Sequence, residues 1–280
     1  GLTSWGRGDW VPVKSRSNLE LTSSVYFYVD TKILAEAANL FGKEEDYQYY
    51  AALAEKIKNA INEKYLDRET GIYASGTQTE LSVPLQWKVV PEDMIGKVAG
   101  NLAKRVKEAG FHLDVGVLGA KAILNALSEN GYPDVAYKIA VQDTYPSWGW
   151  WIVNGATTLL ENWDLDAERD ISDNHMMFGE IGAWFFKGLG GIYPDASQPG
   201  FKHIILRPHF EKDLDQFDAR FNSPRGLIHS GWKWQGGKVN YQIVVPPNSN
   251  ATLYLPEYVE GSRLIQLDAG AHNLTFSIKK

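Results

Sequence analysis

The sequence predicts a mainly α-helical protein that ends in a β domain, and two patterns support this. Apolar residues recur at helical spacing from about residue 17 to residue 189, whereas they alternate with polar residues after about residue 200. The segment between the two patterns, residues 194–200, is rich in Pro, Gly, Ser and Asp, which are turn residues. We therefore expect a helical domain over residues 1–195 and a β domain over residues 196–280.

The helical domain should begin with a helix whose apolar residues Val25, Tyr28, Ile33 and Leu40 follow helical spacing, and which ends near Gly42. Further helices are expected at residues 43–65, 80–88, 91–109, 115–130, 133–143 and 175–189. Short turns with Gly or Pro join these helices, and no repeat of about 30–45 residues is visible. The pattern therefore favours a closed array of antiparallel helices over a solenoid.

The β domain is expected to be an antiparallel sandwich. Short alternating segments occur at residues 201–210, 217–222, 227–235, 238–245 and 251–255, and turn residues separate them. Regular short strands of this kind are typical of two packed antiparallel sheets.

Composition and charge argue against several classes of protein. The 280 residues carry 28 Lys and Arg against 34 Asp and Glu, a net charge of −6, which argues against nucleic acid as a partner. No apolar run is long enough to span a bilayer, so no membrane partner is expected. There is no cysteine, and the six histidines lack metal-ligand spacing, so neither a metal nor another cofactor is expected. The cytoplasm, the periplasm and secretion all stay open as compartments.

The densest candidate site is the aromatic segment of residues 142–179. The helical pattern breaks at Pro146 and resumes at His175, so the segment should connect helices, and connections often carry functional residues. A carboxyl group that indole rings shield from water has a raised pKa, which suits a general acid or base. Glu161 is the candidate, unless it only caps or salt-bridges a helix end. Its neighbours in sequence are Trp148, Trp150, Trp151, Trp163, Asp173 and His175.

A second cluster opens the chain and contains Trp5, Arg7, Asp9 and Trp10. Large aromatic side chains near a chain end usually belong to a binding face or to a surface whose partner is missing. We therefore expect this chain to be part of a longer one. An Asp in a Gly-Asp-Trp turn more often caps backbone amides than acts as an acid.

Six short segments together resemble one family of enzymes. They are Gly8-Asp9-Trp10 and residues 113–121 (LDVGVLGAK), 145–149 (YPSWG), 155–163 (GATTLLENW), 172–182 (SDNHMMFGEIG) and 199–202 (PGFK). In this order, and with the change from helices to strands in the corresponding place, they are similar to bacterial α-L-rhamnosidases of glycoside hydrolase family 78. The resemblance covers essentially the whole chain.

The resemblance implies part of an (α/α)6 barrel followed by a C-terminal β-sandwich. It implies a glycosidase that removes terminal α-L-rhamnose with inversion, with Glu161 of the G-A-T-T-x-x-E-x-W motif as the general base. It also implies that His175 binds a sugar hydroxyl and that Trp10 forms a wall of the rhamnose pocket. Asp9 and Trp148, from the same motifs, are expected among the substrate-binding residues. The expected partners are rhamnose-containing glycans or glycosides.

The chain departs from the family's pattern in one respect. The family's general acid lies in a D-x-x-x-R-D-E-R motif upstream of the G-D-W motif, and neither D-E-R nor R-D-E occurs here. The expected helices are also fewer than the twelve of the barrel. We therefore expect the acid and the remaining helices to come from an upstream part of the chain, and the isolated chain to be inactive.

Two alternatives stay open on the sequence alone. The chain could belong to another α/α-barrel glycosidase, such as an unsaturated-uronide hydrolase, or it could be a carbohydrate-binding fragment without catalytic activity. Residues 164–170 are a candidate for selecting the group to which rhamnose is attached, although they could also be a solvated charged loop.

Overall fold

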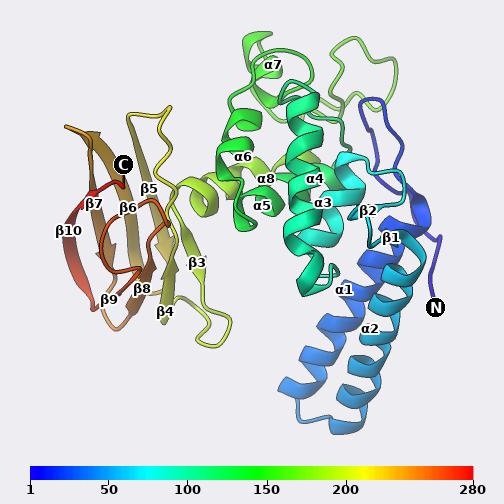
Figure 1. Ribbon diagram of the computed structural model, residues 1–280, viewed down its shortest axis with the longest axis horizontal. Helices are drawn as coiled ribbons and strands as arrows, with labels where there is room; N and C mark the ends of the chain where they lie inside the picture. Colours follow the sequence, from blue (N-terminus) through cyan, green and yellow to red (C-terminus); the bar gives the residue numbers. More distant parts are fainter. Residues whose placement is uncertain (280) are drawn as a thin grey trace. The chain divides into compact units, whose positions relative to one another are not determined.

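In the computed structural model, which describes residues 1–279, the chain divides into two units, Gly1–Glu180 and Ile181–Lys280 (Figure 1). The first unit is helical and the second contains two larger sheets, so the predicted order of helices and then strands is confirmed. The domain limits of 1–195 and 196–280 remain a prediction. None of the helices in the described residues is both long and apolar enough to cross a membrane.

The first two helices form an antiparallel hairpin (Figure 1). α1 (Leu19–Leu40) begins at an N-cap, because the Asn18 side chain accepts a hydrogen bond from the Leu21 N–H at 3.0 Å. α2 (Glu44–Tyr65) opens with three acidic residues, which suit the partial positive charge of a helix N-terminus. Both helices lie where the apolar spacing predicts them.

A small hairpin of β1 (Leu66–Asp67) and β2 (Ile72–Tyr73) follows α2. Four further helices come after it: α3 (Gln78–Gln86), α4 (Ile95–Glu108), α5 (Val117–Glu129) and α6 (Pro133–Ala140). α5 packs against both α3 and α6, and most of its residues are buried. The buried Glu80 carboxylate accepts hydrogen bonds from the backbone N–H of Thr77, in a capping box, and from that of Asn18 at 2.8 Å. This carboxylate therefore holds the first residues of α1 and α3 together.

The region from residue 146 to residue 189 departs from the predicted helices in two places. α7 (Trp148–Val153) lies in the segment expected to be a connection, because the Ser147 hydroxyl accepts a hydrogen bond from the Trp150 N–H at 2.9 Å and starts a helical turn. The single helix expected at residues 175–189 is not formed, and its sequence contains three glycines, which disfavour a long helix. The segment consists of a 3-10 turn (Met176–Phe178), α8 (Glu180–Trp184) and a π-helical turn (Phe185–Leu189).

The β unit contains two four-stranded sheets. One has the order β10-β7-β6-β5 and is formed by β5 (Gln216–Ser223), β6 (Gly226–Gln235), β7 (Lys238–Val245) and β10 (Gly270–Ser277). The other has the order β3-β4-β8-β9 and is formed by β3 (Ile192–Pro194), β4 (His203–Leu206), β8 (Asn250–Tyr254) and β9 (Leu264–Leu267). Every pairing is antiparallel except that of β4 with β8, which is parallel. The sequence pattern did not predict β3, β9 and β10.

The core of the β unit is formed by alternate residues of both sheets. Ile228 and Trp232 of β6 and Tyr241 of β7 are fully buried. The Trp232 indole N–H donates to the Leu189 carbonyl at 3.2 Å, and the Ser230 and Tyr241 hydroxyls share a hydrogen bond of 2.8 Å. The interior of this sandwich therefore contains polar groups that are hydrogen-bonded, among packed apolar side chains.

Candidate active site

The Asp9 carboxylate holds the N-terminal segment against the start of α5. Its oxygens accept hydrogen bonds from the backbone N–H groups of Gly116, Leu118 and Gly119, at 2.8, 2.8 and 3.1 Å, and from the Thr79 hydroxyl. N–H groups in a first helical turn have no partner within the helix and carry partial positive charge, so they suit a carboxylate. Burial raises the pKa of Asp9 above its ordinary value, although these hydrogen bonds oppose the shift.

Trp10 is fixed in place by the same anchor. Its carbonyl accepts a hydrogen bond from the Val117 N–H at 2.9 Å. A Cβ atom at Gly116 would lie only 2.2 Å from that carbonyl oxygen, so only glycine permits the approach. The Trp10 ring is half-buried, and the Arg7 guanidinium carbon lies 5.3 Å from its centroid in a cation–π contact.

The segments that carry Glu161 and His175 run side by side. The Glu161 N–H donates to the Ser172 carbonyl at 3.0 Å, and the His175 N–H donates to the Leu159 carbonyl at 2.8 Å. The Thr158 hydroxyl also donates to the carbonyl of residue 173. These backbone contacts bring together the two motifs that the sequence analysis singled out.

A cluster of buried aromatic rings supports both segments. The Trp151 and Trp163 rings stack at 4.8 Å between centroids, and Trp148 meets Trp163 edge-on at 5.3 Å. Phe178 packs on Trp163 at 4.4 Å. Since Trp163 follows Glu161 by two residues and Phe178 follows His175 by three, the cluster joins the two segments from the protein interior.

Each indole in the cluster has a polar partner. The N–H groups of Trp148, Trp151 and Trp163 donate to the carbonyls of Phe178, Trp163 and Val115, at 3.0, 3.2 and 2.8 Å. Trp148 is only 4% exposed, so its ring faces the protein interior. Three of the four indoles that the sequence placed around Glu161 therefore form the support of the loop, whereas Trp150 lies outside this cluster and meets Tyr145.

Glu161 and His175 each keep one side-chain atom without a partner in the described part of the chain. Glu161 Oε2 accepts a hydrogen bond from the Ser172 N–H at 3.2 Å, and no contact engages Oε1. His175 Nδ1 accepts from the Met177 N–H at 3.2 Å, so the neutral ring carries its proton on Nε2. Both side chains are half-buried. The pair thus offers an acceptor and a donor to a bound molecule.

A cavity of about 1190 Å³ lies between the N-terminal segment and the loop that follows Glu161. Trp10 and other residues from 7 to 19 line one side, and residues from 162 to 170 line the other. Glu161 and His175 are not among the residues that line it. The structure therefore places Trp10 and Asn162, the residue directly after Glu161, on the same cavity.

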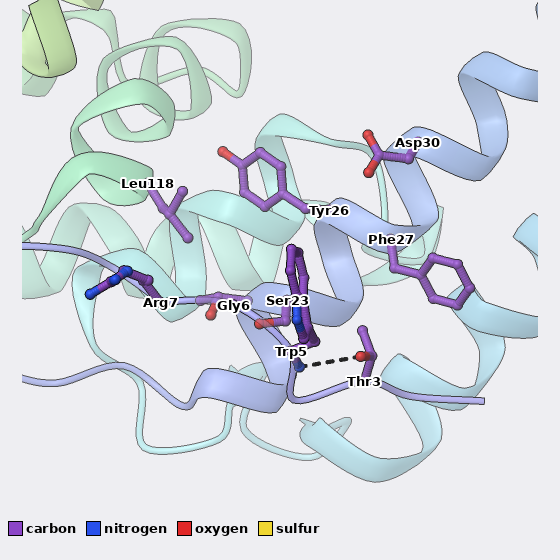
Figure 2. A pocket seen from close by; sticks show the side chains of 11 residues that line it. Thr3, Trp5, Gly6, Arg7, Ser23, Tyr26, Phe27, Asp30 and Leu118 are labelled. Carbon is purple, nitrogen blue, oxygen red and sulfur yellow. Dashed lines mark hydrogen bonds between the residues drawn. The ribbon is translucent and has the colours of Figure 1, made fainter.

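A smaller cavity, of about 440 Å³, shares Arg7 and Gly8 with the larger one. Figure 2 shows the aromatic side chains of Trp5, Tyr26 and Phe27 around it, and the Trp5 N–H donates to the Thr3 hydroxyl at 3.2 Å. The N-terminal cluster found in the sequence therefore lies along two adjoining cavities.

Sequence reasoning missed the basic residues Lys14 and Arg16, which also line the larger cavity. Only their positive charge could have pointed to them, because the acidic residues of the loop at 162–170, which line the other side of the cavity, lie far from them in the sequence. Among residues 1–279, no cluster of three or more His, Asp or Glu side chains could hold a metal ion.

Two family models match the chain. Residues 1–189 match the bacterial alpha-L-rhamnosidase 6 hairpin glycosidase domain, and residues 191–266 match the bacterial alpha-L-rhamnosidase C-terminal domain.

The chain is also similar to solved structures and to curated proteins of this kind. The chain is 35% identical to the alpha-L-rhamnosidase from Dictyoglumus thermophilum, with a TM-score of 0.89 over 99% of this chain and 34% of that one. It is 26% identical to the Streptomyces avermitilis alpha-L-rhamnosidase that was crystallised with L-rhamnose, with a TM-score of 0.88 over 98% of this chain and 28% of that one. A curated Streptomyces avermitilis alpha-L-rhamnosidase is 29% identical over 258 residues, which are 90% of this chain. The chain spans 25% of that relative's length.

Proposed function

The chain belongs to the bacterial α-L-rhamnosidase 6 hairpin glycosidase family, and from this membership we propose that it forms part of the active site of an inverting α-L-rhamnosidase. The whole protein would hydrolyse terminal α-L-rhamnose from rhamnosides. Glu161 would be the general base, and a carboxylic acid outside these 280 residues would be the general acid.

Inversion requires two carboxyl groups on opposite faces of the sugar, about 6.5–9.5 Å apart, so that a water molecule fits beside the base. Glu161 would take a proton from this water as its oxygen bonds to the anomeric carbon. The acid would give a proton to the glycosidic oxygen as its bond to that carbon breaks. The half-exposed carboxylate with one unpartnered oxygen suits the role of a base.

The other residues would bind and position the sugar. His175 would donate its Nε2–H to a rhamnose hydroxyl, and the half-buried Trp10 ring would cover an apolar face of the sugar. Asp9 would act through the backbone, because its oxygens already accept four hydrogen bonds from the protein. Trp148 would act from the interior by supporting the loop.

One observation carries the proposal. Glu161 and His175 lie on paired backbone segments, and each keeps one functional atom without a partner among the described residues. A purely structural Glu at a helix end would use its carboxylate within the protein, as Glu80 does.

The test uses the whole protein that contains this sequence and p-nitrophenyl α-L-rhamnoside. Glu161→Gln should lower turnover about 10²- to 10⁴-fold, as loss of a general base does, while rhamnose binding and the melting temperature stay close to wild type. Glu45→Gln, an exposed position on α2, is the matched control and should change neither. NMR should show that the rhamnose first released has the anomeric configuration opposite to that of the substrate. Near-normal turnover of Glu161→Gln would remove Glu161 from the mechanism.

The 280-residue chain alone provides a second test. It should not hydrolyse the aryl rhamnoside, because the proposed acid lies outside it. Turnover that disappears in Glu161→Gln would instead show that the acid lies within these residues. A whole protein that binds rhamnose without hydrolysing any rhamnoside would be a carbohydrate-binding protein.

A further inference from the structure

Two of the six segments that carry the family resemblance meet at a contact that the proposed function leaves unexplained. Residues 113–121 end in Lys121 on α5, and residues 172–182 contain Glu180 at the start of α8. The Lys121 ammonium nitrogen lies 3.7 Å from Glu180 Oε2. The Asn125 side chain, one turn further along α5, donates to Glu180 Oε1 at 2.8 Å. Both oxygens of this carboxylate therefore have a contact with α5.

The hydrogen bond from Asn125 is the stronger of these two contacts. Asn125 is 2% exposed, and its NH2 group also donates to the Lys121 carbonyl at 3.4 Å. A carboxylate and a carbonyl only accept hydrogen bonds, so the nitrogen of the amide faces them. The Glu180 side chain is 16% exposed, and a hydrogen bond to a charged group shielded from water is strong. The Lys121 side chain is half-exposed, so its ion pair contributes little.

The turn between His175 and Glu180 is short and stiff. His175 Nδ1 accepts from the Met177 N–H at 3.2 Å, and the Gly179 N–H donates to the Met176 carbonyl at 2.9 Å. The turn also packs against α5. A shift of Glu180 would therefore move the backbone that carries the His175 ring.

The same helix holds Trp10. The Asp9 carboxylate accepts hydrogen bonds from N–H groups in the first turn of α5, and the Trp10 carbonyl accepts from the Val117 N–H at 2.9 Å. Asn125 follows Val117 by about two helical turns. Because an α-helix is stiff over this length, α5 forms one frame for Trp10 at its start and for Glu180 further along.

We propose that Glu180, through its hydrogen bond with Asn125, is a positioning residue of the rhamnose site. It fixes the turn that carries His175 relative to the helix that holds Trp10, so that both reach the same sugar. The proposal rests on the proposed function, because it takes His175 and Trp10 as sugar contacts. Glu180 itself acts through His175 and not on the reacting atoms.

The experiment measures KM and kcat of the whole protein for p-nitrophenyl α-L-rhamnoside, and its binding of rhamnose by calorimetry. Glu180→Ala should raise KM and the dissociation constant of rhamnose about three- to fivefold. It should leave kcat within about twofold of wild type, because a contact made alike in the bound substrate and in the transition state affects binding alone. Glu180→Gln keeps an oxygen for the Asn125 donor and should return both values to near wild type. Asn125→Ala removes that donor and should reproduce the effect of Glu180→Ala, which keeps the test available if one of the two variants does not fold.

A double-mutant cycle separates positioning from general stabilisation. Because Glu180 acts through His175, adding Glu180→Ala to His175→Ala should raise KM no further. The control Asn62→Ala removes a hydrogen bond of 2.9 Å from α2 to the Val89 carbonyl, and should lower the melting temperature while leaving KM unchanged. Effects of the two single variants that multiply in the double variant overturn the proposal. So does a Glu180→Gln variant as impaired as Glu180→Ala.

The result for His175→Ala distinguishes this proposal from the proposed function. If His175→Ala weakens rhamnose binding and neither Glu180→Ala nor Asn125→Ala does, the positioning role is overturned and the proposed function stays intact. If His175→Ala itself leaves rhamnose binding unchanged, the role of His175 in the proposed function is contradicted, and the positioning role is overturned with it.

Discussion

The two units differ in how they satisfy their buried polar groups. Within residues 1–279, the buried side-chain oxygens Gln86 Oε1 and Asn125 Oδ1 have no hydrogen-bond partner, and both lie in the helical unit. In the β unit, by contrast, the buried Ser230 and Tyr241 hydroxyls bond to each other, and the Trp232 N–H reaches a carbonyl. An unsatisfied buried polar group costs about 1–3 kcal/mol, so the helical unit carries the larger cost.

The units also differ in the apolar surface of their longest elements. Phe27, Leu34 and Phe41 recur every seven residues along and just after α1, and Ile33 and Leu40 lie beside them in sequence, all exposed. An exposed apolar row of this kind usually marks a surface that contacts a partner. In the β unit the exposed large apolar side chains, such as Phe221, Leu227 and Leu264, are spread over several strands, whereas in the helical unit, which holds the candidate active site, they form a row along one helix.

The largest expected effect tests the closed core of the β unit. Trp232→Ala should lower the free energy of unfolding by about 3–5 kcal/mol, because it leaves a cavity among packed aromatic rings. Urea unfolding of the 280-residue chain, followed by circular dichroism, measures it. Trp5→Ala is the control, since that ring is 88% exposed, and should change the free energy by less than about 0.5 kcal/mol. Equal effects of the two variants would contradict a core closed around Trp232.

The second effect concerns the anchor of the proposed sugar site. Asp9→Ala should lower the free energy of unfolding by about 1–3 kcal/mol, because three backbone N–H groups at the start of α5 and its N-cap lose their acceptor. It should also weaken rhamnose binding by the whole protein, because Trp10 loses its fixed backbone. Asp9→Asn retains one acceptor oxygen and should have a smaller effect on both. Unchanged unfolding in Asp9→Ala would show that this carboxylate does not hold the segment.

The comparison also explains what the sequence could predict. The helices of residues 19–140 follow from local spacing and caps, such as Asn18 before α1, and these signals lie within a few neighbouring residues. Pairings between distant segments cannot be predicted in this way. The parallel pairing of β4 with β8 and the short strand β3 depend on tertiary contacts. β10 shows weak alternation, since only Leu274 and Phe276 face the core among polar neighbours.

The candidate site shows the same limit. Motif resemblance located Glu161 and His175, but their pairing depends on backbone contacts across the loop. The sequence placed the indole rings around Glu161, whereas their N–H groups turn them toward interior carbonyls. The contact of Asp9 with Gly116 joins residues more than a hundred positions apart, which no local pattern reveals.

A smaller effect is expected on the exposed row of α1. Leu34→Gln combined with Leu40→Gln should change the free energy of unfolding by less than about 0.5 kcal/mol, because both side chains are exposed in this chain. The same change should reduce self-association of the 280-residue chain, measured by analytical ultracentrifugation. Leu21→Gln, at a fully buried position of the same helix, is the control and should be strongly destabilising. Unchanged association would show that the row is not a contact surface.

The smallest effects concern pH, and the two units should respond with opposite sign. Burial raises the pKa of Asp9 in the helical unit above its ordinary value of 3.8. In the β unit, burial alone would raise the pKa of Glu211, but hydrogen bonds from the His209 ring at 3.1 Å and the Asp213 N–H at 3.2 Å lower it below its ordinary value of 4.5. A raised folded-state pKa means that the folded protein holds the proton more tightly than the unfolded chain does, and a lowered pKa means the reverse.

The part of the free energy of unfolding that depends on protonation of Asp9 should therefore be fully present below pH 3.8 and be lost as pH rises through its folded-state pKa. The contribution of Glu211 should be fully present above pH 4.5 and be lost as pH falls through its folded-state pKa. Urea unfolding of wild type, Asp9→Asn and Glu211→Gln across this acid range measures both. As pH rises, the advantage of wild type over Asp9→Asn should shrink, while its advantage over Glu211→Gln should grow. If the two advantages of wild type changed in the same direction with pH, the folded-state pKa values of Asp9 and Glu211 would not be shifted in opposite directions.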